Sequence, residues 1–180
     1  MPQVKITDAA GLHQTSGKGT ITYRSGLKGV VVPLFTSATA LSAAGALTVN
    51  TLYHNSDTTT SAYTLPAAAN CVAGDVICVK YIGIIGNGNT HKYGTSGEFF
   101  ADTSLIFKST NSANGVVYDH DVANGTSDDF LNIVGDTDAS GGKGSVLMFV
   151  FNGTQWHVEG TLVGTGTGAD AAVNAEFAAT

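Results

Sequence analysis

Charge, proline and cysteine are all scarce in this chain of 180 residues. It holds 8 basic and 14 acidic side chains against 43% hydrophobic residues, a balance that excludes a highly charged disordered protein. No apolar run reaches the roughly 18 residues of a membrane span, so we expect no transmembrane helix and no membrane partner. The net charge of −6 argues against general binding to nucleic acid.

The two cysteines, Cys71 and Cys78, do not form a C-x-x-C pair, so the sequence predicts neither a zinc ribbon nor a thioredoxin-like motif. The N-terminal residues lack the apolar stretch of a secretory signal. Free thiols and the missing signal together lead us to expect folding in a reducing cytoplasm.

Glycine and threonine are abundant, with 23 residues each. Short apolar runs alternate with glycine- and asparagine-rich turns at intervals of roughly 8 to 15 residues, and amphipathic helical patterns are missing between them. We therefore predict an all-β protein with an antiparallel β-sandwich or jelly-roll body. The clearest local signal is a hairpin, in which residues 145–151 and 156–163 flank a short turn at Asn152-Gly153.

The charges are unevenly distributed along the chain. Residues 1–30 carry four basic residues and one acid, a net of +3, whereas residues 31–180 carry four basic residues and 13 acids, a net of −9. This asymmetry predicts a basic, extended N-terminal arm over residues 1–29 that orders on a partner. After the arm we expect a β-sandwich domain over residues 30–163. The remaining residues, 164–180, would form a flexible tail with one helical turn near 170–179.

The segment SVLMFVF is apolar at both alternating sets of positions. A strand of this kind is either central between two layers or faces a subunit interface. We expect a role in the core or in an oligomer interface for four large side chains of this hairpin: Leu147, Phe149, Phe151 and Trp156.

Residues for catalysis are present but are not arranged in a recognisable motif. The five histidines are scattered, and the G-x-S-x-G signature of a hydrolase is missing. Asp119 and Asp121 would share one face of a strand and could hold Ca²⁺, although solvated turn acids are the commoner explanation for such a pair. We therefore expect neither an enzyme nor a bound cofactor, and we assign no metal ligand.

Two segments carry a resemblance to known proteins. YTLPAAANCVAGDVICVKY, followed much later by GSVLMFVFNGTQWHVEGTLV, is similar to a pattern of strands and turns in bacteriophage virion proteins. The similarity covers about residues 47–163 and carries no catalytic signature. It implies a homotrimeric β-sandwich or jelly-roll module of the kind found in fibres, spikes and capsid decoration proteins.

Only about 30 residues precede the β-rich body, which leaves no room for a fibre shaft. Among the virion roles we therefore expect a capsid decoration, or cement, protein on the outer surface of the virion. Its partners would be the major capsid protein and further copies of itself, as a homotrimer. The expected contacts to the shell come from the arm: Lys5, Ile6, Lys18, Tyr23, Arg24 and Lys28.

The alternative from the same resemblance is a receptor-binding tip of a tail fibre. Such a module would expose aromatic side chains in loops for binding glycans on the host surface, and His91, Tyr93 and Tyr118 are the candidates. A polysaccharide hydrolase that uses Asp119 and Asp121 is a further alternative.

Overall fold

The computed structural model describes residues 3–7, 11–16, 38–112, 115–135, 142–164 and 175–179. The chain divides into two compact units, Met1–Pro33 and Leu34–Thr180. The all-β prediction is confirmed, since the helical structure in the described ranges is a single 3₁₀ turn, η1 (Ala68–Asn70). Within those ranges, none of the helical segments has the length and apolarity to cross a membrane.

The N-terminal unit contains a two-stranded hairpin, which the sequence did not predict. Strands β1 (Gln3–Thr7) and β2 (Gly11–Ser16) pair antiparallel, with Lys5 opposite His13 and Ile6 opposite Leu12. A hairpin of two strands has little stability of its own in water, because it lacks a second layer on which to bury a face.

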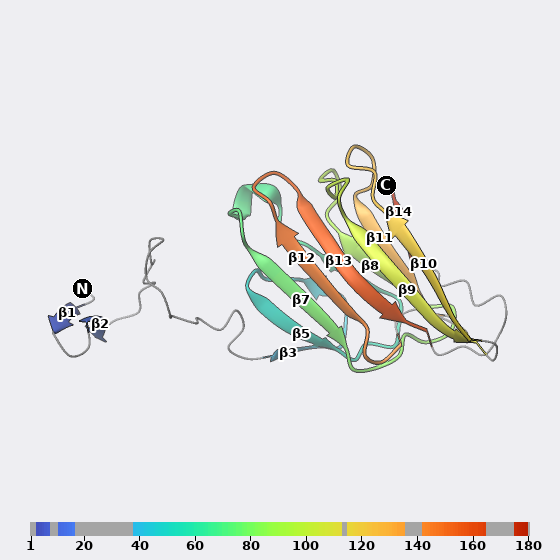
Figure 1. Cartoon of the computed structure of the whole chain (residues 1–180), viewed down its shortest axis with the longest axis horizontal. Coiled ribbons are helices and arrows are strands. Elements are labelled where there is room, and N and C mark those ends of the chain that lie inside the picture. The colour runs from blue at the N-terminus through green and yellow to red at the C-terminus, as the bar shows by residue number, and fades with distance from the viewer. Residues whose placement is uncertain are drawn as a thin grey trace. The chain divides into compact units, whose positions relative to one another are not determined.

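The second unit, which we call the body, is built from two sheets (Figure 1). The larger sheet has seven strands in the order β10 (Gly115–Val122), β9 (Leu105–Ser112), β13 (Trp156–Val163), β12 (Val146–Phe151), β7 (Val76–Tyr81), β5 (Thr51–Asn55) and β3 (Ala38–Leu41). The smaller sheet has five, in the order β14 (Ala175–Ala178), β11 (Phe130–Val134), β8 (Thr90–Gly94), β6 (Ser61–Thr64) and β4 (Gly45–Ala46).

The first part of the body winds between the two sheets. Strands β3, β5 and β7 belong to the larger sheet and β4, β6 and β8 to the smaller one, so each strand is followed by one in the opposite layer. A strand that returns to its own sheet after this crossing runs in its earlier direction, and the neighbours pair parallel. The prediction of antiparallel strands is therefore wrong for this part of the body, and also for the pair β13 and β9.

The predicted hairpin of residues 145–163 is confirmed. Strands β12 and β13 pair antiparallel from Val146 opposite Thr161 to Phe151 opposite Trp156. The side-chain oxygen of Asn152 accepts hydrogen bonds from the backbone N–H groups of Thr154 and Gln155, both at 2.9 Å, and Gly153 has a φ of 105°. Asparagine and glycine supply this turn because one closes it with its side chain and the other tolerates a positive φ.

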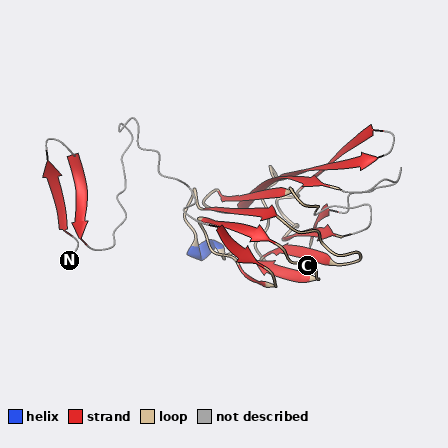
Figure 2. Cartoon of the chain, turned by 90° about the horizontal axis from the view of Figure 1, so that it is seen from below, coloured by secondary structure: helices blue, strands red, loops and turns tan. Residues whose placement is uncertain are grey.

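The core lies between the two layers, which Figure 2 shows from a second direction. On β12, Leu147, Phe149 and Phe151 point into it, and Trp156 joins them from β13. The indole N–H of Trp156 donates a hydrogen bond of 3.0 Å to the carbonyl oxygen of Pro66. The structure therefore places these four side chains in the core of a single copy, which is one of the two roles expected for them.

Two segments differ from their predictions. Residues 86–97, whose glycine, asparagine and threonine content predicts a polar loop or a long hairpin tip, contain β8, which lies between β6 and β11 in the smaller sheet. Polar residues enter this strand because their side chains find hydrogen-bond partners inside the protein. The helical turn expected near 170–179 is wrong for residues 175–178, which form β14 and bury Ala175.

Candidate functional site

The outer face of the larger sheet presents an apolar band that crosses several strands. Residues paired between neighbouring strands lie side by side on one face. From the strand registers, one row of the outer face runs across the sheet through these side chains: Val122, Leu105, Glu159, Met148, Cys78 and Leu52. The next row contains His120, Phe107, Thr161, Val146, Lys80 and His54.

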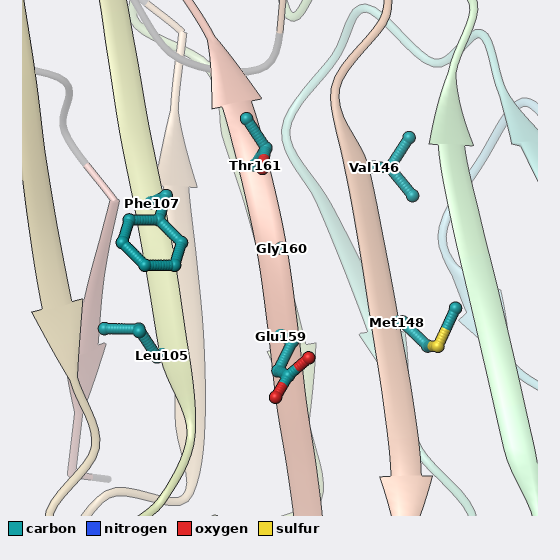
Figure 3. A pocket seen from close by; sticks show the side chains of 7 residues that line it. All are labelled: Leu105, Phe107, Val146, Met148, Glu159, Gly160 and Thr161. Atoms are coloured by element: carbon teal, nitrogen blue, oxygen red, sulfur yellow. The ribbon is translucent and has the colours of Figure 1, made fainter.

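The middle of this band is hollowed into an open groove of about 350 Å³ (Figure 3). Leu105 and Phe107 line one side of the groove from β9, and Val146 and Met148 line the other from β12. Strand β13 forms the floor, where Glu159 and Thr161 point outward and Glu159 supplies one carboxylate, while Gly160 between them contributes backbone. The lining is thus mainly apolar, with a single acid at its centre.

A chain of hydrogen bonds runs along the edge of the groove. The Nδ1 atom of His157 lies 3.0 Å from the hydroxyl oxygen of Thr103, and its Nε2 atom lies 3.1 Å from a carboxylate oxygen of Glu159. Hydroxyl, imidazole and carboxylate stand in the order used for nucleophilic catalysis. The sequence could not indicate this grouping, because the parallel pairing of β13 with β9 brings together residues more than 50 positions apart.

Solvent exposure limits what this chain of hydrogen bonds can do. The side chain of Glu159 is 73% exposed and that of His157 is 22% exposed. Water screens such a pair, whereas stabilisation of an oxyanion depends on a site that excludes water. Thr103, His157 and Glu159 are therefore best described as polar surface residues at the rim of the apolar band.

A second cluster of functional groups lies inside the body and joins its two sheets. Asp57 is buried, and its carboxylate accepts hydrogen bonds from the hydroxyl groups of Ser61 at 2.5 Å and Tyr63 at 2.9 Å. It also accepts bonds from the backbone N–H and the hydroxyl group of Thr59, at 2.9 and 2.7 Å. Burial opposes ionisation of this group, but the hydrogen bonds outweigh it and lower the pKa of Asp57 to about 2.

A relay of hydrogen bonds begins at the backbone N–H of Asp57 and runs through the core. The side chain of Asn55 accepts a bond from the backbone N–H of Asp57 and donates one of 3.0 Å to the hydroxyl of Tyr93. The hydroxyl groups of Tyr93 and Tyr81 are 2.7 Å apart, and Tyr81 reaches Nδ1 of His91 at 3.1 Å. Asn55 and Tyr81 come from the larger sheet, and Tyr93 and His91 from the smaller one.

The partners of His91 assign its tautomer. Its Nε2 atom lies 3.0 Å from the carbonyl oxygen of Thr59, which can only accept, so Nε2 carries the proton and Nδ1 accepts from Tyr81. Burial lowers the pKa of His91, in keeping with a neutral ring, and burial raises the pKa values of Tyr81 and Tyr93. Because each of these side chains is hydrogen-bonded to the next one in the relay, and the relay includes residues of both sheets, it holds the sheets in register.

The glycan-binding loop expected around His91 and Tyr93 is therefore wrong. Both side chains are fully buried, and the ring of Tyr93 stacks on that of Tyr63 at 4.8 Å between centroids. The backbone of Tyr118 lies in β10, and its side chain is outside the described part of the structure.

The expected arm residues are placed only in part. Lys5 and Ile6 lie in β1, whereas Lys18, Tyr23, Arg24 and Lys28 lie outside the described residues.

The two aspartates considered for Ca²⁺ lie on β10, two residues apart and thus on one face of the strand. Asp121 accepts a hydrogen bond of 2.7 Å from the backbone N–H of Phe177, which ties β10 to β14 in the opposite sheet. Across the residues whose placement is described, histidine, cysteine, aspartate and glutamate form no group of three that could hold a metal ion.

Comparison of this chain with protein-family models, with curated proteins and with solved structures found no match.

Proposed function

We propose that this chain is a non-enzymatic decoration protein that binds the outside of a bacteriophage capsid shell and stabilises it. The observation that carries the proposal is the division of the chain into two units of opposite charge. The unit Met1–Pro33 has four basic residues and one acid, a net of +3, and Leu34–Thr180 has four basic residues and 13 acids, a net of −9. A small basic unit carried by a larger acidic body suits a protein that docks by its N-terminal part.

The hairpin of β1 and β2 supports a docking role for the N-terminal unit. Among the residues that the structure describes, each of these strands has one edge without a neighbouring strand, and extended segments with such an edge bind by adding a strand to a partner's sheet. Lys5 on β1 adds positive charge that steers the unit towards an acidic surface of the major capsid protein. The partner sheet would supply the stability that two strands lack alone.

The body supports a structural role over a catalytic one. Its buried polar groups, from Asp57 to His91, are engaged with one another in holding the two sheets together. The exposed polar groups near Thr103 lie in an open, solvated position. Self-association of the body, as a trimer in keeping with the resemblance to virion proteins, would multiply weak contacts of several N-terminal units through their effective concentration.

The proposal is tested with empty shells assembled from the major capsid protein encoded in the same genome. Full-length protein is expected to co-sediment with these shells and to raise their resistance to heat or denaturant. A chain that lacks residues 1–29 should remain folded by circular dichroism and lose shell binding. Full occupancy of the shells by the shortened chain would contradict the docking role of the N-terminal unit.

A further inference from the structure

Exposed apolar side chains concentrate on the outer face of the larger sheet. Phe107, Met148, Val122 and Val163 are 53%, 40%, 49% and 38% exposed, and they come from four adjacent strands. Single exposed apolar residues are common on any protein surface, but a contiguous patch marks an interaction site. Together with the groove, these side chains form a band that a partner could cover.

Two opposite charges lie on the strands either side of β12, the acid within the band and the base next to it. Glu159 lies on β13, opposite Met148 of β12, and Lys80 lies on β7, opposite Val146 of β12. Both charged side chains are exposed. The outward side chains of β12 itself are Val146, Met148 and Val150, which carry no charge.

We propose that this face is the interface between copies of this chain, arranged around a rotation axis that runs parallel to β12. Rotation about such an axis places β13 of one copy against β7 of the next, with Glu159 and the neighbour's Lys80 two residues apart along the strands, a diagonal that two long side chains can span. The proposal deepens the self-association of the body and rests on that part of the proposed function.

The occupant of the face is a second copy because the face is complementary to itself. Residues on the strand nearest the axis meet their own counterparts, so a charge there would repel itself, and β12 presents only apolar side chains. Residues on the flanking strands meet those of the opposite flank, where Glu159 of one side lies diagonally across from Lys80 of the other, one row along the strands. A partner of different sequence would require neither an uncharged β12 nor opposite charges on the two strands beside it.

The dimensions of the face fit such an interface. Six strands spaced about 4.8 Å apart, with about six residues each rising about 3.3 Å, cover roughly 570 Å² before the relief of the side chains is added. A specific interface buries about 800 Å² on each partner.

The test is a charge exchange in the full-length protein, measured by sedimentation velocity over a range of concentrations without shells. Wild-type protein is expected to form oligomers. The variants Glu159→Lys and Lys80→Glu each place like charges together and should weaken association by at least about tenfold. The double variant restores an opposite pair and should regain association to within about threefold of wild type.

Matched controls make the same charge changes elsewhere. Glu176→Lys on β14 and Lys92→Glu on β8 alter side chains of the smaller sheet and should leave association unchanged. A further variant, Met148→Asp, puts a charge beside the axis and should yield monomers with the circular dichroism of wild type.

A wild-type chain that stays monomeric at every concentration would overturn the proposal and leave the face to another occupant. Single variants that associate as well as the controls, or a double variant that does not regain association, would overturn it too. Shell binding is measured separately, so loss of the self-association proposal leaves the test of the decoration role intact.

Discussion

At the scale of single residues, the body depends on polar groups placed where its two sheets meet. Asn55, Tyr81, Tyr93 and His91 form one uninterrupted relay, and its last member donates to a backbone carbonyl. Buried polar groups are costly when one partner is removed, because the group left behind keeps its desolvation penalty. The relay therefore specifies which strands face each other as much as it adds stability.

Replacement of Tyr81 by phenylalanine tests the relay. The ring stays in place, but Nδ1 of His91 loses its donor and the hydroxyl of Tyr93 loses its acceptor. We expect a loss of about 1–3 kcal/mol in the free energy of unfolding, measured by urea denaturation. The comparison variant Tyr53→Phe removes a hydroxyl with one partner, the backbone N–H of Thr48, and should cost less. Equal losses in the two variants would contradict a special role for the relay.

Stability should fall in two steps as the pH is lowered. The pKa of His91 is lowered in the folded protein, so the unfolded chain binds more protons below its ordinary value of 6.5, and stability decreases as pH falls through that value. The pKa of Asp57 is about 2 when folded and 3.8 ordinarily, so its contribution of about 2 kcal/mol is present above pH 3.8 and is lost towards pH 2.

The variant Asp57→Asn separates the two steps. It should be less stable than wild type at neutral pH but lose less further stability between pH 4 and 2, as followed by urea denaturation at each pH. The step associated with His91 should remain in this variant. If this variant loses as much stability between pH 4 and 2 as wild type does, other carboxylates cause that loss.

The same residues show where sequence reasoning fell short at this scale. His91 and Tyr93 stand in a segment of glycine, asparagine and threonine, which is typical of a loop. They are buried because Tyr81, Asn55 and the carbonyl oxygen of Thr59 satisfy them from other strands. Those partners lie outside any local window of sequence, so the pattern of the segment could not indicate its burial.

At the scale of elements, the strand pairing that was predicted correctly is one in which the partner follows directly in sequence. Strands β12 and β13 flank a turn of Asn152 and Gly153 that sets their register, and both carry large apolar side chains at the alternate positions that are buried. The parallel pairs, such as β5 with β7, are separated by a strand of the opposite sheet. Nothing local in the sequence encodes such a crossing, and the antiparallel expectation failed there.

The end of β8 offers a test of how tightly neighbouring strands pack. Gly94 has a φ of 153°, and a Cβ atom there would overlap the carbonyl oxygen of Asp129 and the ring of Phe130. Gly88 has a φ of 73° with open space around it. Replacement of Gly88 by alanine should cost about 1 kcal/mol for the backbone alone. Gly94→Ala should cost at least about 2 kcal/mol more in thermal or urea unfolding, because β11 must shift. Similar losses in the two variants would contradict this packing.

At the scale of the whole molecule, the structure separates two kinds of surface. The described residues of the N-terminal unit form a hairpin, and the sequence of this unit has a net positive charge; the body presents a broad apolar face, with Glu159 and Lys80 on the strands either side of β12. The sequence indicated the positive charge of the N-terminal residues but not the hairpin. It also indicated that β12 is apolar on both faces, and the structure divides these side chains into a buried set and an outward set.

The division of roles follows from these two surfaces. The apolar face suits association of like copies, since its charges are matched across β12. The basic unit suits an unlike, acidic partner. Assembly of the body would then present several N-terminal units at once, and shell binding by the assembly would exceed that of one unit.

Co-sedimentation of the full-length protein with empty shells, at increasing salt concentration, is the most direct test of the decoration role. The account predicts saturable binding that weakens as salt rises, because screening reduces the attraction between the basic unit and an acidic shell surface. It also predicts that the chain lacking residues 1–29 does not bind at any salt concentration. Binding of that shortened chain at full occupancy, or no binding of the full-length chain even at low salt, would contradict the account.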